Sequence, residues 1–193
     1  ILSDLALHIE TVTRTIDQHT VEGPVDLGPI QIAFLESNAP EKHHFNQSVL
    51  LKSSTPIQET ALRQALSALV LHHDALRMVY RQTPEGWQQL NLGIAQGYHL
   101  EVLDTSEPLP YYEQLQSGID LANGPLLRAG LFHDRLLLVI HHLVVDGVSW
   151  RILLEDLSAL YNQFTQGLPF SLPQKTDSFQ YWQQQLRRYD TTK

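Results

Sequence analysis

The sequence predicts a two-layer fold that mixes helices and strands, of the α/β or α+β class, in which helices pack on a mostly antiparallel central sheet. Segments with helical spacing of apolar residues alternate with short strand-like segments. Two apolar segments, 126–132 and 135–142, flank the polar pair His133 and Asp134, which predicts an antiparallel hairpin. The chain has 193 residues, 42% of them hydrophobic and 18% charged, enough for one sizeable core or two small ones.

In the first half of the chain, the spacing of apolar and turn-forming residues predicts each element in order. Apolar residues three and four apart predict an amphipathic helix over 3–19. Two prolines and two glycines then predict a linker over 21–29, with a short helix beginning at Pro29. A strand over 45–52 and a helix over 57–72 follow.

The second half continues with strand segments at 75–82, 87–92 and 99–104, separated by turn-like stretches. A helix within 111–121 precedes the predicted hairpin. Two further helices, 149–166 and 177–188, are joined by a segment that contains prolines.

Composition excludes several functional classes. A formal net charge of −8 with only 13 Lys and Arg leaves no basic surface for nucleic acid. No cysteine is present, so disulfides and thiolate zinc sites are excluded, and we expect a cytoplasmic protein. The first 18 residues lack the basic start of a secretory signal, and no apolar run is long enough to cross a membrane.

The sequence HHLVVDGVSW, residues 141–150, places polar residues where a buried strand ends and a helix begins. Loops at strand ends commonly display reactive groups. His141 and His142 are adjacent on a strand, so their side chains should face opposite ways and cannot share one metal ion. Gly147 would allow a tight turn and Ser149 would cap the next helix. The alternative is a strand end, an ordinary turn and a helix cap without chemistry.

The HHxxxDG pattern resembles the signature of the condensation superfamily of nonribosomal peptide synthetases, which has the chloramphenicol acetyltransferase-like fold. Three further stretches resemble blocks of that family in the same order: DLGPIQIAFLE, HHDALRMVY and GPLLRAGLF. Within the superfamily, HHFNQSVLL, VVDGVSWRILLEDL and LPQKTDSFQYW are similar to epimerization domains. Condensation domains more often have tryptophan directly after DG, whereas this chain has Val148 there and Trp150 two positions later.

The resemblance implies roles for particular residues. His142 would be the catalytic histidine that removes a proton α to a thioester, because imidazole can accept a proton near neutral pH. His141 would point away and pack structurally. Asp146 would pair with Arg77 and brace the loop.

The resemblance also implies the organisation of the domain. Residues 1–20 would be a linker helix that follows a carrier domain, and 21–193 the N-terminal lobe of a two-lobed domain whose C-terminal lobe, with its glutamate, is absent. The substrate would be an aminoacyl or peptidyl thioester on the 4'-phosphopantetheine arm of a partner peptidyl carrier domain, with no cofactor bound directly. We expect the isolated lobe to be inactive and to self-associate through its uncovered apolar face.

Two other functions stay open. The chain could be the lobe of a condensation domain that forms amide bonds between carrier-bound thioesters, or a docking module that only binds a carrier domain. The histidine pairs His43–His44 and His72–His73 lack neighbouring cysteines or carboxylates at metal-ligand spacing, so we expect no metal site.

Overall fold

The computed structural model describes residues 15–93, 97–105 and 109–190. The elements follow one another as β1 (Gly23–Val25), α2 (Pro29–Glu36), η1 (Lys42–His44), β2 (Asn46–Lys52), α3 (Glu59–His72), η2 (Asp74–Arg77), β3 (Met78–Thr83), β4 (Gly86–Asn91), β5 (His99–Val102), α4 (Leu109–Ser117), β6 (Leu127–Phe132), β7 (Arg135–His141), α5 (Gly147–Thr165) and α6 (Phe179–Asp190). The predicted mixture of helices and largely antiparallel strands is confirmed.

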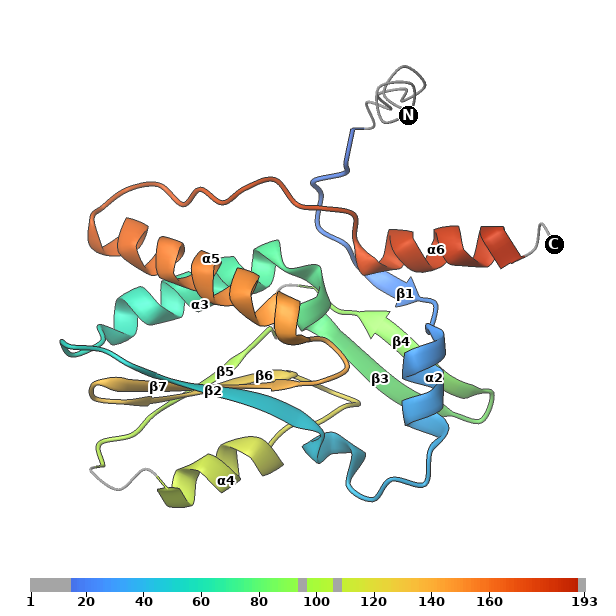
Figure 1. Cartoon of the computed structure of the whole chain (residues 1–193), viewed down its shortest axis with the longest axis horizontal. Helices are drawn as coiled ribbons and strands as arrows, with labels where there is room; N and C mark the ends of the chain where they lie inside the picture. The colour runs from blue at the N-terminus through green and yellow to red at the C-terminus, as the bar shows by residue number, and fades with distance from the viewer. Residues whose placement is uncertain (1–14, 94–96, 106–108, 191–193) are drawn as a thin grey trace, which may run out of the picture.

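The strands form two sheets where the sequence predicted one. A four-stranded sheet has the order β2-β7-β6-β5, and a three-stranded sheet has the order β1-β4-β3 (Figure 1). The hairpin predicted around His133 and Asp134 is present as β6 and β7, which pair antiparallel. The exception to antiparallel pairing is β5, which runs parallel to β6.

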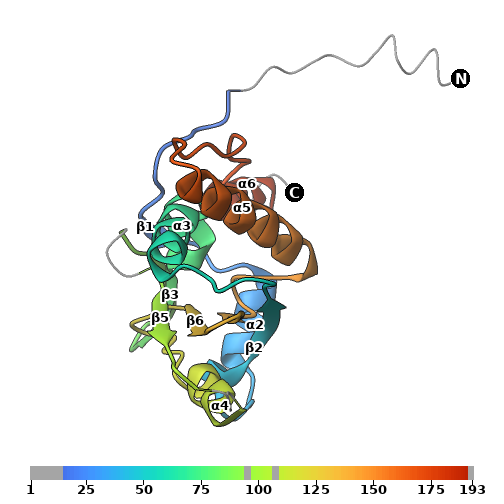
Figure 2. The same cartoon turned by 90° about the vertical axis from the view of Figure 1, so that its left-hand side faces the viewer.

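Strand β7 carries a core on each of its faces, because successive side chains of a strand point to opposite sides. Leu136, Leu138 and Ile140 belong to the core beneath α3 and α5. Leu137 and Val139 belong to a second core, which α2, β3 and α4 also line. Figure 2 shows the result: α3 and α5 lie above the four-stranded sheet and α4 lies below it. A continuous apolar run in the sequence is therefore a strand that is buried on both faces.

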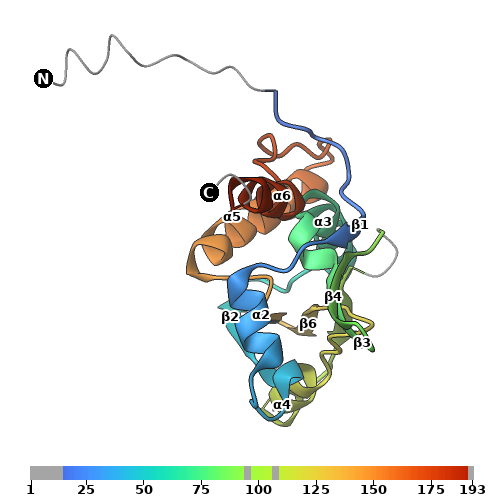
Figure 3. The same cartoon turned by 90° about the vertical axis from the view of Figure 1, so that its right-hand side faces the viewer.

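Strand β1 lies within the segment predicted to be only a linker, so that prediction was wrong for residues 23–25. It pairs antiparallel with β4, with Pro24 opposite Leu90. Proline is tolerated because β1 is an edge strand, where no further partner needs its missing N–H. Helix α6 lies beside β1 (Figure 3), and Gln180 Nε2 donates to the Pro24 carbonyl at 2.9 Å.

The predicted N-terminal helix over 3–19 lies mostly outside the described residues, since 1–14 are not described. Residues 15–19, which are described, carry no helix. Within the described ranges, no helix combines the length and hydropathy that crossing a membrane requires.

Helix α3 gives a direct test of the core beneath α3 and α5. Leu66 is fully buried in this core, whereas Leu71 on the same helix is 41% exposed. We expect Leu66→Ala to lower the free energy of unfolding by about 2–5 kcal/mol, because it leaves a cavity among packed side chains. Leu71→Ala should cost less than about 1 kcal/mol. Urea denaturation of the two variants measures both values, and equal losses would contradict this core.

Candidate functional site

The two histidines of the motif lie where β7 ends and face opposite sides of its sheet. His141 pairs with Asn46 of β2, and the His142 N–H donates to the Phe45 carbonyl at 2.9 Å, which continues the ladder by one step. By strand alternation His141 shares the face of Leu137 and Val139, and His142 the face of Ile140. Only His142 is therefore directed to the side of α5.

His141 is fully buried and held at both ring nitrogens. Its Nε2 lies 2.8 Å from the Lys42 carbonyl oxygen, and its Nδ1 accepts the N–H of Leu143 at 3.2 Å. Burial lowers the pKa of His141 to about 4, since desolvation penalises the imidazolium. These are the surroundings of a neutral packing residue.

His142 is half-buried and is held on three sides. Its Nδ1 lies 2.8 Å from the Val145 carbonyl oxygen, and its ring stacks on Phe45 with centroids 5.0 Å apart. Its Nε2 lies 3.0 Å from Nε2 of Gln47, whose Oε1 accepts the indole N–H of Trp150 at 2.8 Å. Gln47 was not among the residues predicted from the sequence. Alternation along β2 could have found it, because Gln47 interrupts the apolar face formed by Val49 and Leu51.

Asp146 is the N-cap of α5, a role that the sequence assigned to Ser149. Asp146 Oδ1 accepts both the backbone N–H and the hydroxyl of Ser149, each at 2.7 Å. The backbone N–H donor lowers the pKa of Asp146 below its ordinary value. Gly147 is the first residue of the helix and is not among the glycines with positive φ, so the predicted special turn was wrong.

The predicted Arg77–Asp146 pair is also wrong. The Arg77 guanidinium is buried and pairs with Asp74 Oδ1 at 2.6 Å. Its other N–H groups donate to the carbonyls of Val70, Leu71, Leu92 and Val21. Arg77 therefore joins the end of α3, the end of β4 and the N-terminal segment, while Asp146 caps α5. The sequence could have predicted the Asp74–Arg77 pair, because Asp74 lies three residues before Arg77 in the stretch HHDALRMVY.

The other histidine pairs have contacts of their own. His72, His73 and Asp156 bring ligand atoms within 4.8 Å of one another, a spacing that was not predicted from the sequence. His73 Nε2 lies 2.7 Å from Asp156 Oδ2, so a hydrogen bond links the C-cap residue of α3 to α5. His44 lies 3.8 Å from the carboxylate of Glu113.

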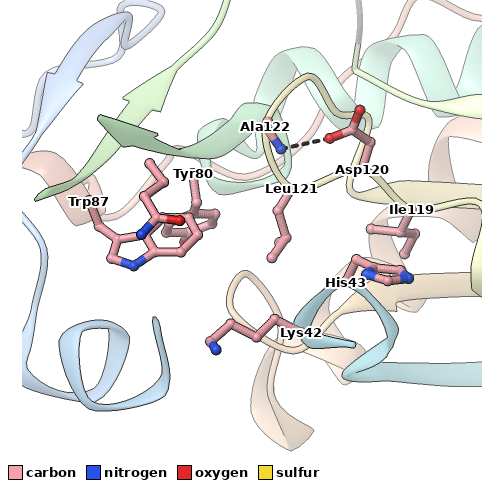
Figure 4. A pocket seen from close by; sticks show the side chains of 9 residues that line it. Lys42, His43, Tyr80, Trp87, Ile119, Asp120, Leu121 and Ala122 are labelled. Atoms are coloured by element: carbon pink, nitrogen blue, oxygen red, sulfur yellow. Dashed lines mark hydrogen bonds between the residues drawn. The ribbon is translucent and has the colours of Figure 1, made fainter. Parts of the chain in front are cut away.

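A cleft of about 550 Å³ lies between β3, β4 and η1, and His142 does not line it. Figure 4 shows Trp87 and Tyr80 on one side of this cleft and His43 and Ile119 on the other. The Asp120 carboxylate accepts N–H groups of its own turn, from Ala122 at 2.8 Å and Asn123 at 3.1 Å. Burial raises the pKa of the Tyr80 phenol. We place the candidate site at His142, whose loop and ring are both braced, and not in this cleft.

Comparison with known proteins supports one family. The family model named Condensation domain matches residues 21–193. The chain belongs to the condensation domain family. It is 46% identical over 206 residues to surfactin synthase subunit 1 of Bacillus subtilis (strain 168), covering 100% of this chain and 6% of that protein. It is 43% identical over 200 residues to tyrocidine synthase 2 of Brevibacillus parabrevis, covering 97% of this chain and 6% of that protein.

Solved structures agree with the family. The epimerization domain from the third module of tyrocidine synthetase B superposes with a TM-score of 0.86 at 43% identity, over 90% of this chain and 42% of that chain. The starter condensation domain of rhizomide synthetase superposes with a TM-score of 0.68 at 15% identity, over 89% of this chain and 44% of that chain. The chain therefore has the fold of the nonribosomal peptide synthetase condensation superfamily and spans less than half of these solved domains.

The cap of α5 predicts contrasting effects at neighbouring positions. Asp146→Ala should lower the free energy of unfolding by about 0.5–2 kcal/mol at neutral pH, because it removes an N-cap. Gly147→Ala is the matched control, since a Cβ there meets nothing within 4 Å, and it should be neutral or stabilising by up to about 1 kcal/mol.

The Asp146 effect should also depend on pH with a defined sign. The folded-state pKa of Asp146 is lowered, so its contribution is complete above the ordinary carboxyl pKa of about 3.9 and is lost as pH falls through the folded-state pKa. Denaturant midpoints of wild type and Asp146→Ala should converge in acid. A constant gap from neutral pH into acid would rule out the ionised cap.

The burial of His141 should make the free energy of unfolding depend on pH in a second range. Its pKa falls from 6.5 to about 4 on folding, so the unfolded chain binds a proton that the folded chain rejects. Its stabilising effect is complete above about 6.5 and falls toward pH 4, with a slope of up to about 1.4 kcal/mol per pH unit. His141→Gln, which can still donate to the Lys42 carbonyl, should flatten this slope in urea titrations between pH 4 and 7. An unchanged slope would contradict a buried neutral His141.

Proposed function

We propose that this chain is the N-terminal lobe of an epimerization domain, which interconverts L and D configurations at the α-carbon of a carrier-bound aminoacyl or peptidyl thioester. The observation that carries the proposal is the 43% identity to an epimerization domain over 90% of the chain. His142 would be the base of this lobe.

The geometry around His142 suits proton removal next to a thioester. A general base must be aimed by its surroundings and must exchange protons near neutral pH, as histidine does. His142 directly follows strand β7, which is paired along its whole length with β2. Its ring stacks on Phe45 and is hydrogen-bonded at Nδ1. His141 is buried in the opposite core, so it is not available to a substrate on this side.

We propose that a second lobe covers the start of α5. Val148 and Ile152 are one helical turn apart and are 65% and 43% exposed. They lie at the start of the helix that follows the His142 loop, so exposed apolar side chains are present there. A second lobe packed there would exclude water from the site and would supply the glutamate that the family resemblance implies. The peptidyl carrier domain would deliver the substrate on its 4'-phosphopantetheine arm.

Condensation is the second candidate function, because the matching family model is that of condensation domains. In that reaction His142 would serve amide bond formation between two carrier-bound thioesters, and no α-proton would exchange. A docking module would bind the loaded carrier without either reaction.

Deuterium exchange separates these functions. The complete two-lobed domain with a loaded carrier should incorporate deuterium from D₂O at the α-carbon, and His142→Ala should lower the exchange rate by roughly 10²–10⁴-fold, the usual contribution of a general base. Mass spectrometry of the released amino acid or peptide measures the exchange.

Two controls complete the experiment. His141→Ala should mainly lower thermal stability, because it removes a buried side chain that is bonded at both ring nitrogens. Residues 1–193 alone should give no exchange. Undiminished exchange in the His142→Ala domain, or exchange by residues 1–193 alone, would overturn the proposal, and amide bond formation without exchange would favour condensation.

A further inference from the structure

We propose that Gln47 is a positioning residue that keeps Nε2 of His142 unprotonated and thereby ready to accept a proton. This inference rests on the proposed function, because an unprotonated Nε2 has value only if His142 is a base. The donors and acceptors that surround the ring determine where its proton lies.

Trp150 fixes which way the Gln47 amide points. The indole N–H can only donate, so the atom of Gln47 that lies 2.8 Å from Trp150 Nε1 must be the carbonyl Oε1. The amide NH₂ is then the group that lies 3.0 Å from Nε2 of His142. Because NH₂ can only donate, Nε2 of His142 must accept and carries no proton.

The other side of the ring requires the same tautomer. Nδ1 of His142 lies 2.8 Å from the Val145 carbonyl oxygen, which can only accept. Nδ1 therefore carries the proton of the neutral ring. Two independent contacts, one from β2 and one from the loop before α5, select the Nδ1–H form and exclude the Nε2–H form.

Gln47 and Trp150 lie on elements that pairing and packing hold in place. Gln47 lies opposite Ile140 within the seven-residue pairing of β2 and β7, and Trp150 is only 9% exposed in the core beneath α5. The hydrogen-bond chain from Trp150 through Gln47 to His142 thus connects the first turn of α5 to the base. A substrate α-carbon that approaches Nε2 would displace the Gln47 N–H from the lone pair.

The tautomer can be read from the imidazole ¹⁵N shifts of the full 193-residue chain after labelling its histidines. The His142→Ala spectrum assigns the His142 signals. At neutral pH we expect Nδ1 to resonate as a protonated nitrogen and Nε2 as an unprotonated one. Gln47→Met keeps the size but removes the amide, so only the Val145 carbonyl still selects the Nδ1–H form, and the fraction of the Nε2–H tautomer should rise. Gln88→Met makes the same change at an exposed position on β4 and should leave the His142 signals unchanged.

A second variant tests the sign of the effect. In Gln47→Glu, one carboxylate oxygen can accept from Trp150 and the other then faces Nε2, which must donate. Nε2 should therefore become protonated, the reverse of the wild type. An Nε2–H tautomer in the wild-type chain would overturn the proposal. An unprotonated Nε2 in a folded Gln47→Glu chain would also overturn it.

Kinetics of the complete domain then separate positioning from structure. Gln47→Met should lower kcat for α-proton exchange in proportion to the fraction of the enzyme that holds the Nε2–H tautomer, roughly twofold if the two tautomers are equally populated, and should leave KM unchanged. A changed tautomer with unchanged kcat would reject the positioning role. If the tautomer responds as expected but His142→Ala exchanges normally, the proposed function fails and the hydrogen-bond chain stands.

Discussion

The register between β2 and β7 is the constraint on which the candidate site depends. Seven consecutive residue pairs, from Asn46–His141 to Lys52–Arg135, fix which side chains face each core. A slip of one residue would move every side chain of β2 to the other face. Gln47 would then leave His142 and Trp150, and Val49 and Leu51 would leave the core beneath α3 and α5. The burial of both faces of β7 makes such a slip costly, so hydrophobic packing determines the geometry of a polar site.

Two separate polar clusters hold the elements around this sheet. The Arg77–Asp74 pair connects the ends of α3 and β4 to the N-terminal segment through hydrogen bonds. Lys175 also contacts Asp74, at 3.2 Å. Asp146 caps α5 and so sets where Trp150 enters the core. Removing Asp146 would therefore not strand the Arg77 guanidinium. A buried arginine whose N–H groups are paired in this way indicates a structural role, because an unpaired guanidinium at that position would be costly.

Local patterns predicted most of the fold, because apolar spacing and turn residues determine where helices and strands lie. The hairpin of β6 and β7 and the long helices follow from them, and so do the opposite directions of His141 and His142. The features of the fold that were not predicted depend on contacts between residues distant in sequence. Strand β1 is specified by pairing with β4, and the partition into two sheets follows from packing on both faces of β7. Gln47 and His142 are 95 positions apart, so only the strand register brings them together.

The two errors at the motif have a common physical cause. Asp146 bonds to Ser149 and Arg77 bonds to Asp74, in each case a residue three positions away in sequence. These local hydrogen bonds take the place of a contact between Asp146 and Arg77. The long-range pair came from family resemblance, whereas each short-range pair was available from spacing alone. Gly147 was expected to allow a tight turn. It instead begins helix α5, where no positive φ is needed.

We propose that Nε2 of His142 receives the α-proton of a carrier-bound thioester. The most direct test is a crystal structure of the complete two-lobed domain with a carrier domain whose phosphopantetheine arm bears a stable amide analogue of the aminoacyl thioester. We predict that Nε2 of His142 lies within about 3–3.5 Å of the α-carbon, the distance of a reactive approach. An α-carbon held away from His142, with Nε2 facing an incoming amine, would contradict this role of His142.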